Sequence, residues 1–254
     1  MLLAIDVGNT NITLGVFEGE KLKASWRLAA DVNRLADEYG VLMVNLLDHE
    51  GIGSEQIDAA VMASVVPDLD PIFESVCRRY FGVRPLVVSA GVRTGLRILY
   101  DSPREVGADR VADAVAAIRL YGQPLILVDL GTATVFDAIS KDGDYLGGAI
   151  APGLVIAAEA LFQRAARLYR VELARPTRAI GQNTVAAVRS GVIYGYVGLV
   201  EGMVSRFKEE LGGEAKVVAT GGWAELVAQE TDVIDVVDTN LTLMGLRFIY
   251  EMNC

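Results

Sequence analysis

The first half of the chain begins with apolar runs and turn signals that are typical of an antiparallel meander. Residues 2–5 form a short apolar run closed by Asp6, which predicts a buried central strand. Two more strands are predicted at residues 11–17 and 22–28, because a Glu-Gly-Glu turn separates them. Further apolar patterns predict a helix at 36–47, a strand at 59–66, a helix at 71–81 and a strand at 86–88.

A helix start is predicted at Ser102. This serine stands one residue before a proline and three residues before Glu105, which is the pattern of a capping box with proline at the first helical position. The helix is expected to run through Ile118 and to end near Gly122.

The second half is predicted to contain strands and helices in a similar order. Its predicted elements are strands at 124–128, 133–139, 145–150 and 216–220, a long helix at 184–211 capped by Asn183, a helix from Ala224 and a closing helix at 241–250. Four glycines lie on the long helix, at Gly191, Gly195, Gly198 and Gly202. Each interior glycine costs about 1 kcal/mol relative to alanine, so we expect another helix to approach this row closely.

The two halves share a motif that indicates an internal duplication. Residues 5–10 and 128–133 both read apolar-Asp-apolar-Gly-polar-small, and they lie 123 residues apart. Each follows a buried strand and precedes a second strand. This repeat predicts two similar α/β halves whose Asp-x-Gly turns face each other. No linker composition separates them, and a boundary near 115–122 gives halves at 1–117 and 118–254.

The amino-acid composition argues against several classes of protein and of catalytic or binding site. Hydrophobic residues make up 52% of the 254 residues, which excludes a disordered chain. The net charge of −10 argues against non-specific binding of nucleic acid or anionic membranes, since both need a basic face. The only histidine is His49 and the only cysteines are Cys77 and Cys254, so a Ser-His-Asp triad, a poly-histidine or cysteine metal site and a disulfide framework are excluded.

The apolar stretches of the chain predict a cytoplasmic protein without a membrane partner. Asp6 interrupts the apolar N-terminus before a signal sequence can form, and no basic residue precedes it. The longest apolar stretch, at 191–200, is too short to span a bilayer. With two cysteines only, the reducing cytoplasm is the simplest compartment.

The candidate chemistry centres first on residues 6–13, the turn after the first strand. Asp6 ends the strand with a carboxylate, and Gly8 lets the backbone turn so that its N–H groups point outward. Such a turn can bind phosphate oxygens while the carboxylate holds Mg²⁺ beside them. An ordinary hairpin turn is the alternative, because Gly and Asn are common there too. The turn matches neither a P-loop nor a Rossmann glycine motif.

A second turn of the same kind favours nucleotide binding. Residues 129–134 repeat the Asp-x-Gly constellation in the other half. An actin-like ATPase cleft needs two such phosphate-binding hairpins, one from each half, which close on a triphosphate. Thr220-Gly221-Gly222 follows a strand and suits the nucleoside, because glycines permit close approach of the backbone. A simple strand-to-helix turn is the alternative for this last motif.

Five short motifs stand in the order found in type III pantothenate kinases, and the chain resembles that family over essentially its whole length. They are Asp6–Asn11, Gly107–Arg110, Asp129–Thr134, Gly147–Gly153 and Ala219–Gly222. The resemblance implies an α/β fold with two duplicated actin-like domains, of the actin/hexokinase/Hsp70 ATPase type, and an interdomain cleft. It implies ATP-dependent phosphorylation of the terminal hydroxyl of pantothenate to 4′-phosphopantothenate, the first step of coenzyme A biosynthesis. It also implies a homodimer that needs Mg²⁺ and K⁺ or NH₄⁺.

The resemblance assigns roles residue by residue, with Asp109 as the catalytic base. The implied pantothenate contacts are Tyr100, Gly107, Ala108, Asp109, Arg110 and Thr184, the last reaching into the site of the other subunit. The implied ATP contacts are Asp6, Val7, Gly8, Asn9, Thr10, Asn11, Ile12, Thr13 and Thr132. Asp6 is implied beside Mg²⁺ and Asp129 as a monovalent-cation ligand; a water-bridged Mg²⁺ at Asp129 stays open. The family pattern commonly has proline at Tyr169 and a smaller apolar residue at Trp223.

Asp109 and Arg110 also fit this chemistry by themselves. Phosphoryl transfer needs a carboxylate to orient the accepting hydroxyl, and Arg binds a substrate carboxylate with forked hydrogen bonds. The alternative is that Asp109 caps a helix and Arg110 is solvated. Two other functions stay open, a non-catalytic relative on the same scaffold and another actin-like kinase of small hydroxy acids or sugars. The joint presence of Asp6, Asp109, Arg110 and Asp129 favours the pantothenate kinase.

Overall fold

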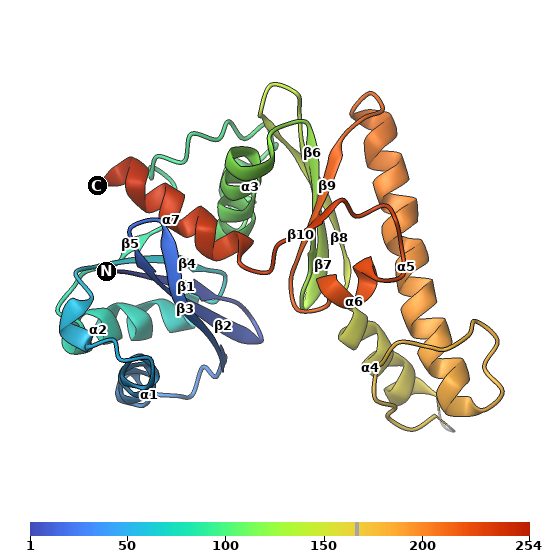
Figure 1. Ribbon diagram of the computed structural model, residues 1–254, viewed down its shortest axis with the longest axis horizontal. Coiled ribbons are helices and arrows are strands. Elements are labelled where there is room, and N and C mark those ends of the chain that lie inside the picture. The colour runs from blue at the N-terminus through green and yellow to red at the C-terminus, as the bar shows by residue number, and fades with distance from the viewer. Residues whose placement is uncertain (166–167) are drawn as a thin grey trace. The chain divides into compact units, whose positions relative to one another are not determined.

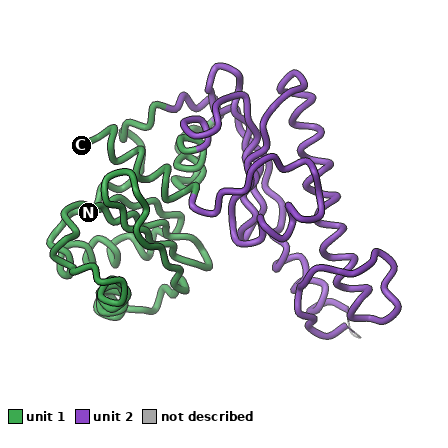
Figure 2. Tube along the Cα trace, in the orientation of Figure 1, with its two compact units in different colours: residues 1–95, 102–116, 241–254 green, residues 96–101, 117–240 purple. Residues whose placement is uncertain are grey.

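The computed structural model describes residues 1–165 and 168–254 (Figure 1). These residues form two compact units, which Figure 2 shows in different colours. Unit 1 consists of residues 1–95, 102–116 and 241–254, and unit 2 consists of residues 96–101 and 117–240.

Unit 1 is built on a five-stranded sheet with the order β3-β2-β1-β4-β5. Its strands are β1 (Leu2–Val7), β2 (Asn11–Glu18), β3 (Lys21–Ala29), β4 (Ala59–Ser64) and β5 (Leu86–Val87). The side chains of Leu3, Ile5 and Val7 form a core with helices α1 (Ala36–His49) and α2 (Asp70–Tyr80). Helix α7 (Leu241–Asn253) lies on the opposite face, where Leu243 packs against Gly15 of β2.

Unit 2 repeats this topology. Its sheet has the order β10-β9-β6-β7-β8, with β6 (Leu125–Leu130), β7 (Ala133–Ile139), β8 (Tyr145–Pro152), β9 (Lys216–Thr220) and β10 (Val236–Val237). In both sheets the central strand has an antiparallel meander on one side and two parallel strands on the other. Residues of this sheet form one hydrophobic core with helices α4 (Leu154–Arg164), α5 (Thr184–Glu210) and α6 (Ala224–Ala228). The duplication expected from the sequence is confirmed.

Most elements lie where the hydrophobic pattern predicts them. The nine predicted strands and the helices α1, α2, α5, α6 and α7 are present, with ends that differ by a few residues. The predicted cap of α5 is also present, because Oδ1 of Asn183 accepts a hydrogen bond from the backbone N–H of Ala186 at 2.9 Å. This cap satisfies one of the free N–H groups at the helix start.

The helix start predicted at Ser102 is wrong. Residues Pro103–Glu105 form only a single 3₁₀ turn, and the side chain of Ser102 makes no capping hydrogen bond. Val106 then returns to extended backbone, with φ −73° and ψ 121°, which ends the turn. The α-helix starts later, as α3 (Ala108–Tyr121). The residues of a capping box are present in the sequence, but they form a short turn before Gly107 and not the first turn of the α-helix.

Helix α4 has no counterpart among the predicted elements. Leu154 and Ala158 are buried on one side of it, whereas Ile156 and Leu161 are 44% and 39% exposed. Apolar residues on all sides of a helix give no periodic signal, so the pattern of residues 154–164 does not identify a helix.

The two units depart from the sequence-based halves at two segments. Helix α7 belongs to unit 1, because it packs so closely on α3 that a Cβ at Gly245 would lie 2.0 Å from the backbone oxygen of Ala112. Residues 96–101 belong to unit 2, where Leu99 donates its N–H to the carbonyl of Tyr145 at 2.8 Å. Both are long-range contacts that local patterns do not encode.

None of the helices in residues 1–165 and 168–254 combines the length and the hydropathy needed to cross a lipid bilayer.

Candidate active site

The turn between β1 and β2 is held in shape by its backbone. The N–H of Gly8 donates to the carbonyl of Asn11 at 3.0 Å, and a Cβ at Gly8 would lie 2.9 Å from that oxygen. The side chains of Asn9 and Thr10 are exposed, and Asp6 is half-buried at the end of β1. The turn therefore presents polar groups to solvent beside a carboxylate, which is the donor set that phosphate oxygens and their cation need.

Two of the predicted ATP contacts are buried. Val7 and Ile12 face each other across the β1–β2 ladder, and both side chains are 0% exposed in the core of unit 1. Only their backbone groups are available to a ligand at this turn.

The Gly107–Arg110 segment lies next to the end of β1. A Cβ at Gly107 would lie 2.4 Å from Oδ1 of Asp109 and 3.4 Å from Cγ1 of Val65. Val65 in turn donates its N–H to the carbonyl of Val7 at 3.0 Å. Asp109 and Arg110 are half-buried in the first turn of α3. Unit 1 thus brings together two motifs that are about a hundred residues apart, the turn after β1 and the proposed base.

The corresponding turn in unit 2 joins β6 to β7. Asp129 is half-buried near the end of β6, and the N–H of Gly131 donates to the carbonyl of Ala133 at 3.1 Å. The ladder register makes this turn one residue shorter than the first turn. Thr132 is exposed at its tip, where its side chain can reach a ligand.

Gly221 lies directly beside the Asp129 carboxylate. Strands β6 and β9 pair in parallel so that Asp129 is the partner of Thr220. Gly221 follows with φ +91°, and a Cβ there would lie 2.4 Å from Oδ1 of Asp129. The glycine pair predicted to face a nucleoside therefore also leaves room for this carboxylate. No local signal connects positions 129 and 221, since strand pairing alone brings them together.

The carboxylate of Asp129 affects the pKa of a tyrosine in the core of unit 2. Burial raises the pKa of Tyr196, and the carboxylate of Asp129 raises it further, to about 12. The Tyr196 hydroxyl therefore stays protonated at neutral pH, and it donates to the carbonyl of Pro152 at 3.1 Å. This hydrogen bond ties α5 to the end of β8.

The turn at the start of α4 packs against the Asp129 turn. A Cβ at Gly153 would lie 2.1 Å from the carbonyl oxygen of Thr132 and 2.6 Å from that of Gly131. Only glycine fits this contact. The close packing explains the glycine at the end of the Gly147–Gly153 motif, whose sequence alone gives no reason for it.

Tyr100 is positioned by the edge of the sheet in unit 2. Ile98 forms a parallel bridge with Tyr145 of β8, and the rings of Tyr100 and Tyr145 meet edge to face with centroids 6.5 Å apart. The hydroxyl of Tyr145 donates to Oδ1 of Asp137 at 2.6 Å in the buried interior. Gly147 has a φ of +131°, and a Cβ at this position would lie 3.3 Å from Cδ2 of the Tyr100 ring.

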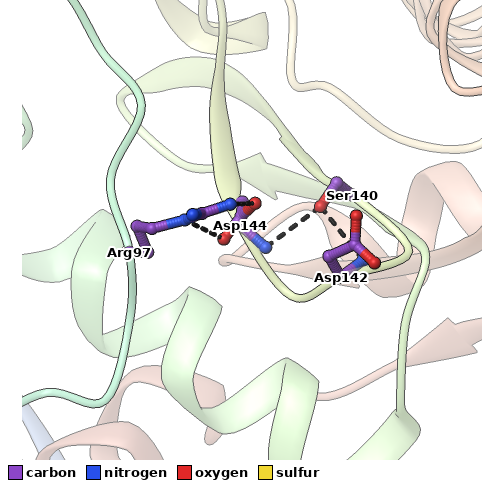
Figure 3. Close-up of polar contacts among 4 residues, drawn as sticks. All are labelled: Arg97, Ser140, Asp142 and Asp144. Atoms are coloured by element: carbon purple, nitrogen blue, oxygen red, sulfur yellow. Dashed lines mark hydrogen bonds and ion pairs between the residues drawn. The ribbon is translucent and has the colours of Figure 1, made fainter.

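Arg97, three residues before Tyr100, forms an ion pair with Asp144, as Figure 3 shows. Nε of Arg97 donates to Asp144 at 2.7 Å, and Nη2 donates to the second carboxylate oxygen. These hydrogen bonds lower the pKa of Asp144, because they favour its charged form. Ser140 supports the same loop, since its Oγ accepts the N–H groups of Asp142 at 3.2 Å and Asp144 at 3.1 Å. No local signal in the sequence predicts this pair, because its two residues lie 47 positions apart.

Thr184 lies on the long helix of unit 2. It is the first residue of α5, whose N-terminal end extends past the sheet of unit 2 (Figure 1). Its side chain is exposed and lines a cavity of about 600 Å³ together with Leu161, Gly191 and Val192.

The donor set of the two turns fits a metal ion that arrives with a nucleotide. In the described part of the chain, no three Asp, Glu, His or Cys side chains form a cluster that could hold a metal. Mg²⁺ is usually bound through one or two carboxylates together with substrate phosphates. Each turn has one such carboxylate, Asp6 in unit 1 and Asp129 in unit 2, so each turn by itself matches the use of a single carboxylate together with phosphate oxygens.

Comparison with known proteins identifies the family. A model of the type III pantothenate kinase family matches residues 2–206. The chain is 54% identical over 253 residues to the type III pantothenate kinase of Moorella thermoacetica, with 100% of both chains covered.

Solved structures support the fold. A Baf family protein from Campylobacter jejuni superposes with a TM-score of 0.64 at 20% identity, covering 99% of this chain and 98% of that one. Component A of (R)-2-hydroxyglutaryl-CoA dehydratase from Acidaminococcus fermentans gives a TM-score of 0.55 at 11% identity, covering 98% and 96%. The architecture is that of actin-like ATPases and sugar kinases. By its sequence over the full length and by its duplicated fold, the chain belongs to the type III pantothenate kinase family.

Proposed function

We propose that this chain transfers the γ-phosphoryl group of ATP to the terminal hydroxyl of pantothenate, the first step of coenzyme A biosynthesis. The observation that carries the proposal is the repeated Asp-x-Gly turn at the end of the central strand of each sheet, in a chain that belongs to this kinase family. A panel assay tests it. ADP formation should be fastest with pantothenate, whereas faster turnover with a sugar or another hydroxy acid would contradict it.

The first turn is proposed to bind the ATP phosphates. Its outward backbone N–H groups, with the side chains of Asn9, Thr10, Asn11 and Thr13, suit phosphate oxygens, and Thr132 adds a hydroxyl from the second turn. Asp6 would hold Mg²⁺, which neutralises charge on the phosphates when it is bound. Val7 and Ile12 contribute through their backbone, because their side chains are buried.

Asp109 and Arg110 are proposed to act on pantothenate. The carboxylate of Asp109 orients the terminal hydroxyl and accepts its proton as the phosphoryl group transfers. The guanidinium of Arg110 binds the carboxylate of pantothenate with paired hydrogen bonds. Gly107 and Ala108 complete this segment. The supporting observation is that a Cβ at Gly107 would lie 3.4 Å from Val65, whose N–H donates to the carbonyl of Val7 at the end of β1.

Asp129 is proposed to hold K⁺ or NH₄⁺. Its carboxylate lies against Gly221 and Gly131, so it is fixed close to the second phosphate turn. A bound monovalent cation there would reduce repulsion between this carboxylate and the nucleotide. The alternative role is a water-bridged Mg²⁺ at the same oxygens.

Removing the support of Tyr100 should weaken substrate binding. An Arg97→Ala enzyme loses the ion pair with Asp144, and the segment that carries Tyr100 becomes less ordered. Because the pair is partly solvent-exposed, we expect the KM for pantothenate to rise only about two- to fivefold, with kcat unchanged. Arg78→Ala is the matched control, since it removes the exposed Arg78–Glu74 pair on α2. An unchanged KM in the Arg97→Ala enzyme would show that the pair does not position Tyr100.

The chain is proposed to act as a homodimer through α5. Apart from their chain neighbours and the backbone of their own helix, no described heavy atom lies within 4 Å of the Cβ positions of Gly191, Gly195 and Gly198, and all three glycines are exposed. The helix expected to approach this row is thus not part of the same chain. Thr184 at the end of the same helix would then complete the substrate site of the other subunit.

A bulky residue in the glycine row tests this dimer. Gly195→Leu and Gly195→Ala both improve helix propensity, and a Cβ at this position would meet no described atom beyond its chain neighbours and the backbone of its own helix, so both should fold. Only leucine is expected to weaken self-association, because its side chain blocks close helix approach. Sedimentation velocity should give a shift from dimer to monomer for Gly195→Leu alone, accompanied by a higher KM for pantothenate. A fully active wild-type monomer of 27.2 kDa would contradict the dimer.

A further inference from the structure

We propose that the indole of Trp223 stacks on the nucleotide base, in a cavity of unit 2 between α4 and the start of α6. The inference rests on the proposed kinase function and adds a residue that determines how the phosphate donor is held. The cavity measures about 610 Å³. That volume lies within the range of 300–1,000 Å³ typical of small-molecule sites.

The walls of the cavity are mostly apolar. Helix α4 contributes Val155, Ala158 and Phe162, which stand three and four residues apart and therefore share one face of the helix. Val171 and Leu173 line it from the following segment. Trp223 closes it from the residue before α6. Such a lining suits a flat, uncharged ring better than a phosphate.

The charged side chains of this cavity lie at its exposed edge. Arg170 pairs with Glu159 at 3.5 Å, and their side chains are 81% and 45% exposed. Glu172 is 87% exposed and pairs at 3.8 Å with Arg189. These groups keep their solvation and their counter-charges, so they do not build an anion site inside the cavity.

The backbone connects Trp223 directly to the second phosphate turn. Its N–H donates to the carbonyl of Leu130, the residue after Asp129, at 3.2 Å. On the other side of the cavity, α4 begins beside the same turn, because Gly153 lies against the carbonyl of Thr132. A nucleotide with its phosphates at the Asp129 turn therefore has this apolar cavity within reach of its base.

Stacking on an aromatic side chain is a common way to hold a base. It depends on the π-face that every base has, and removing the aromatic ring typically weakens binding about five- to a hundredfold per base. Trp223 is half-buried, so one part of the indole packs on the core of unit 2 while the rest lines the cavity. The large indole thus gives this chain a stacking surface beside its Gly-Gly turn.

Tryptophan fluorescence tests the contact directly. The chain has two tryptophans, and Trp26→Phe leaves Trp223 as the only one. Trp26 lies in β3 of unit 1 and plays no part in the proposed site. Mg·ADP should quench the emission of the Trp26→Phe protein, whereas magnesium tripolyphosphate at equal occupancy should not. Equal quenching by both would point to a phosphate-driven movement and would overturn the stacking.

Kinetics provide the second readout. Trp223→Ala should raise the KM for ATP about five- to a hundredfold while kcat and the KM for pantothenate stay unchanged, and Trp223→Phe should retain most of the affinity. Leu226→Ala is the control for lost packing, because Leu226 packs on the same core but does not line the cavity. It should lower the Tm without changing the KM for ATP. An unchanged KM in a folded Trp223→Ala enzyme would overturn the inference.

The outcomes also separate this inference from the proposed function. If equilibrium dialysis shows that ADP binds without changing Trp223 emission, the stacking is wrong and the kinase proposal stands. If ADP does not bind and pantothenate is not phosphorylated, both are wrong.

Discussion

An Asp109→Asn enzyme is expected to lose about 10²–10⁴-fold in kcat, the usual effect of removing a general base. Asparagine keeps the size and most of the hydrogen bonding of the side chain, but it removes the charge and the basic lone pair. The accepting hydroxyl of pantothenate is a weak nucleophile at neutral pH, and a carboxylate in contact with it both orients it and takes its proton. Steady-state kinetics with saturating ATP and pantothenate would measure the loss.

The structure offers a matched control for this variant. Glu105 is an exposed carboxylate four residues earlier, in the 3₁₀ turn before α3. Glu105→Gln should leave kcat unchanged, which separates loss of the base from a general change of charge near α3. ADP binding to the Asp109→Asn enzyme should stay close to wild type. Wild-type kcat in Asp109→Asn would mean that Asp109 only caps α3 and that the base lies elsewhere.

Replacing K⁺ by Na⁺ at constant ionic strength is expected to reduce activity by about 10²-fold, the scale of losing one fixed electrostatic contact to the reacting phosphates. The structural reason is the second carboxylate at Asp129, which lies against Gly221 and Gly131 at the proposed second phosphate turn. If Asp6 alone bound the divalent ion and no cation bound at Asp129, the Asp129 carboxylate would only repel the phosphates of the nucleotide. Initial rates against K⁺ concentration should therefore rise and saturate in the wild-type enzyme.

Asp129→Asn distinguishes the two ions that this position could hold. With a monovalent cation at Asp129, the variant should lose its response to K⁺ while its Mg²⁺ requirement stays the same. With a water-bridged Mg²⁺ there, the variant should instead need more Mg²⁺ and keep its response to K⁺. Equal wild-type rates in Na⁺ and K⁺ would contradict the monovalent site.

The sequence predicts those parts of the site that are local. An apolar run closed by Asp6, and its repeat at Asp129, is enough to predict two strands with a turn after each, and the structure has both. Asn183 likewise predicts the start of α5 through its own side chain. These features depend on residues within one turn or one strand, where spacing and side-chain chemistry are sufficient.

The remaining parts depend on contacts between distant residues. Gly221 lies against Asp129 only because β9 pairs with β6, and α7 returns to unit 1 because Gly245 fits against Ala112. The Arg97–Asp144 pair connects a loop to the far end of a hairpin. No periodicity encodes such contacts. In α4 the opposite problem arises, because apolar residues on several faces hide the helical pattern.

The most direct test of the kinase is ADP release from ATP and Mg²⁺ in K⁺ buffer, with and without pantothenate, combined with mass spectrometry of the product. The account predicts slow ADP release without pantothenate and fast release with it, with one 4′-phosphopantothenate formed for each ADP. Equal ADP release in both conditions, or no phosphorylated pantothenate, would contradict it.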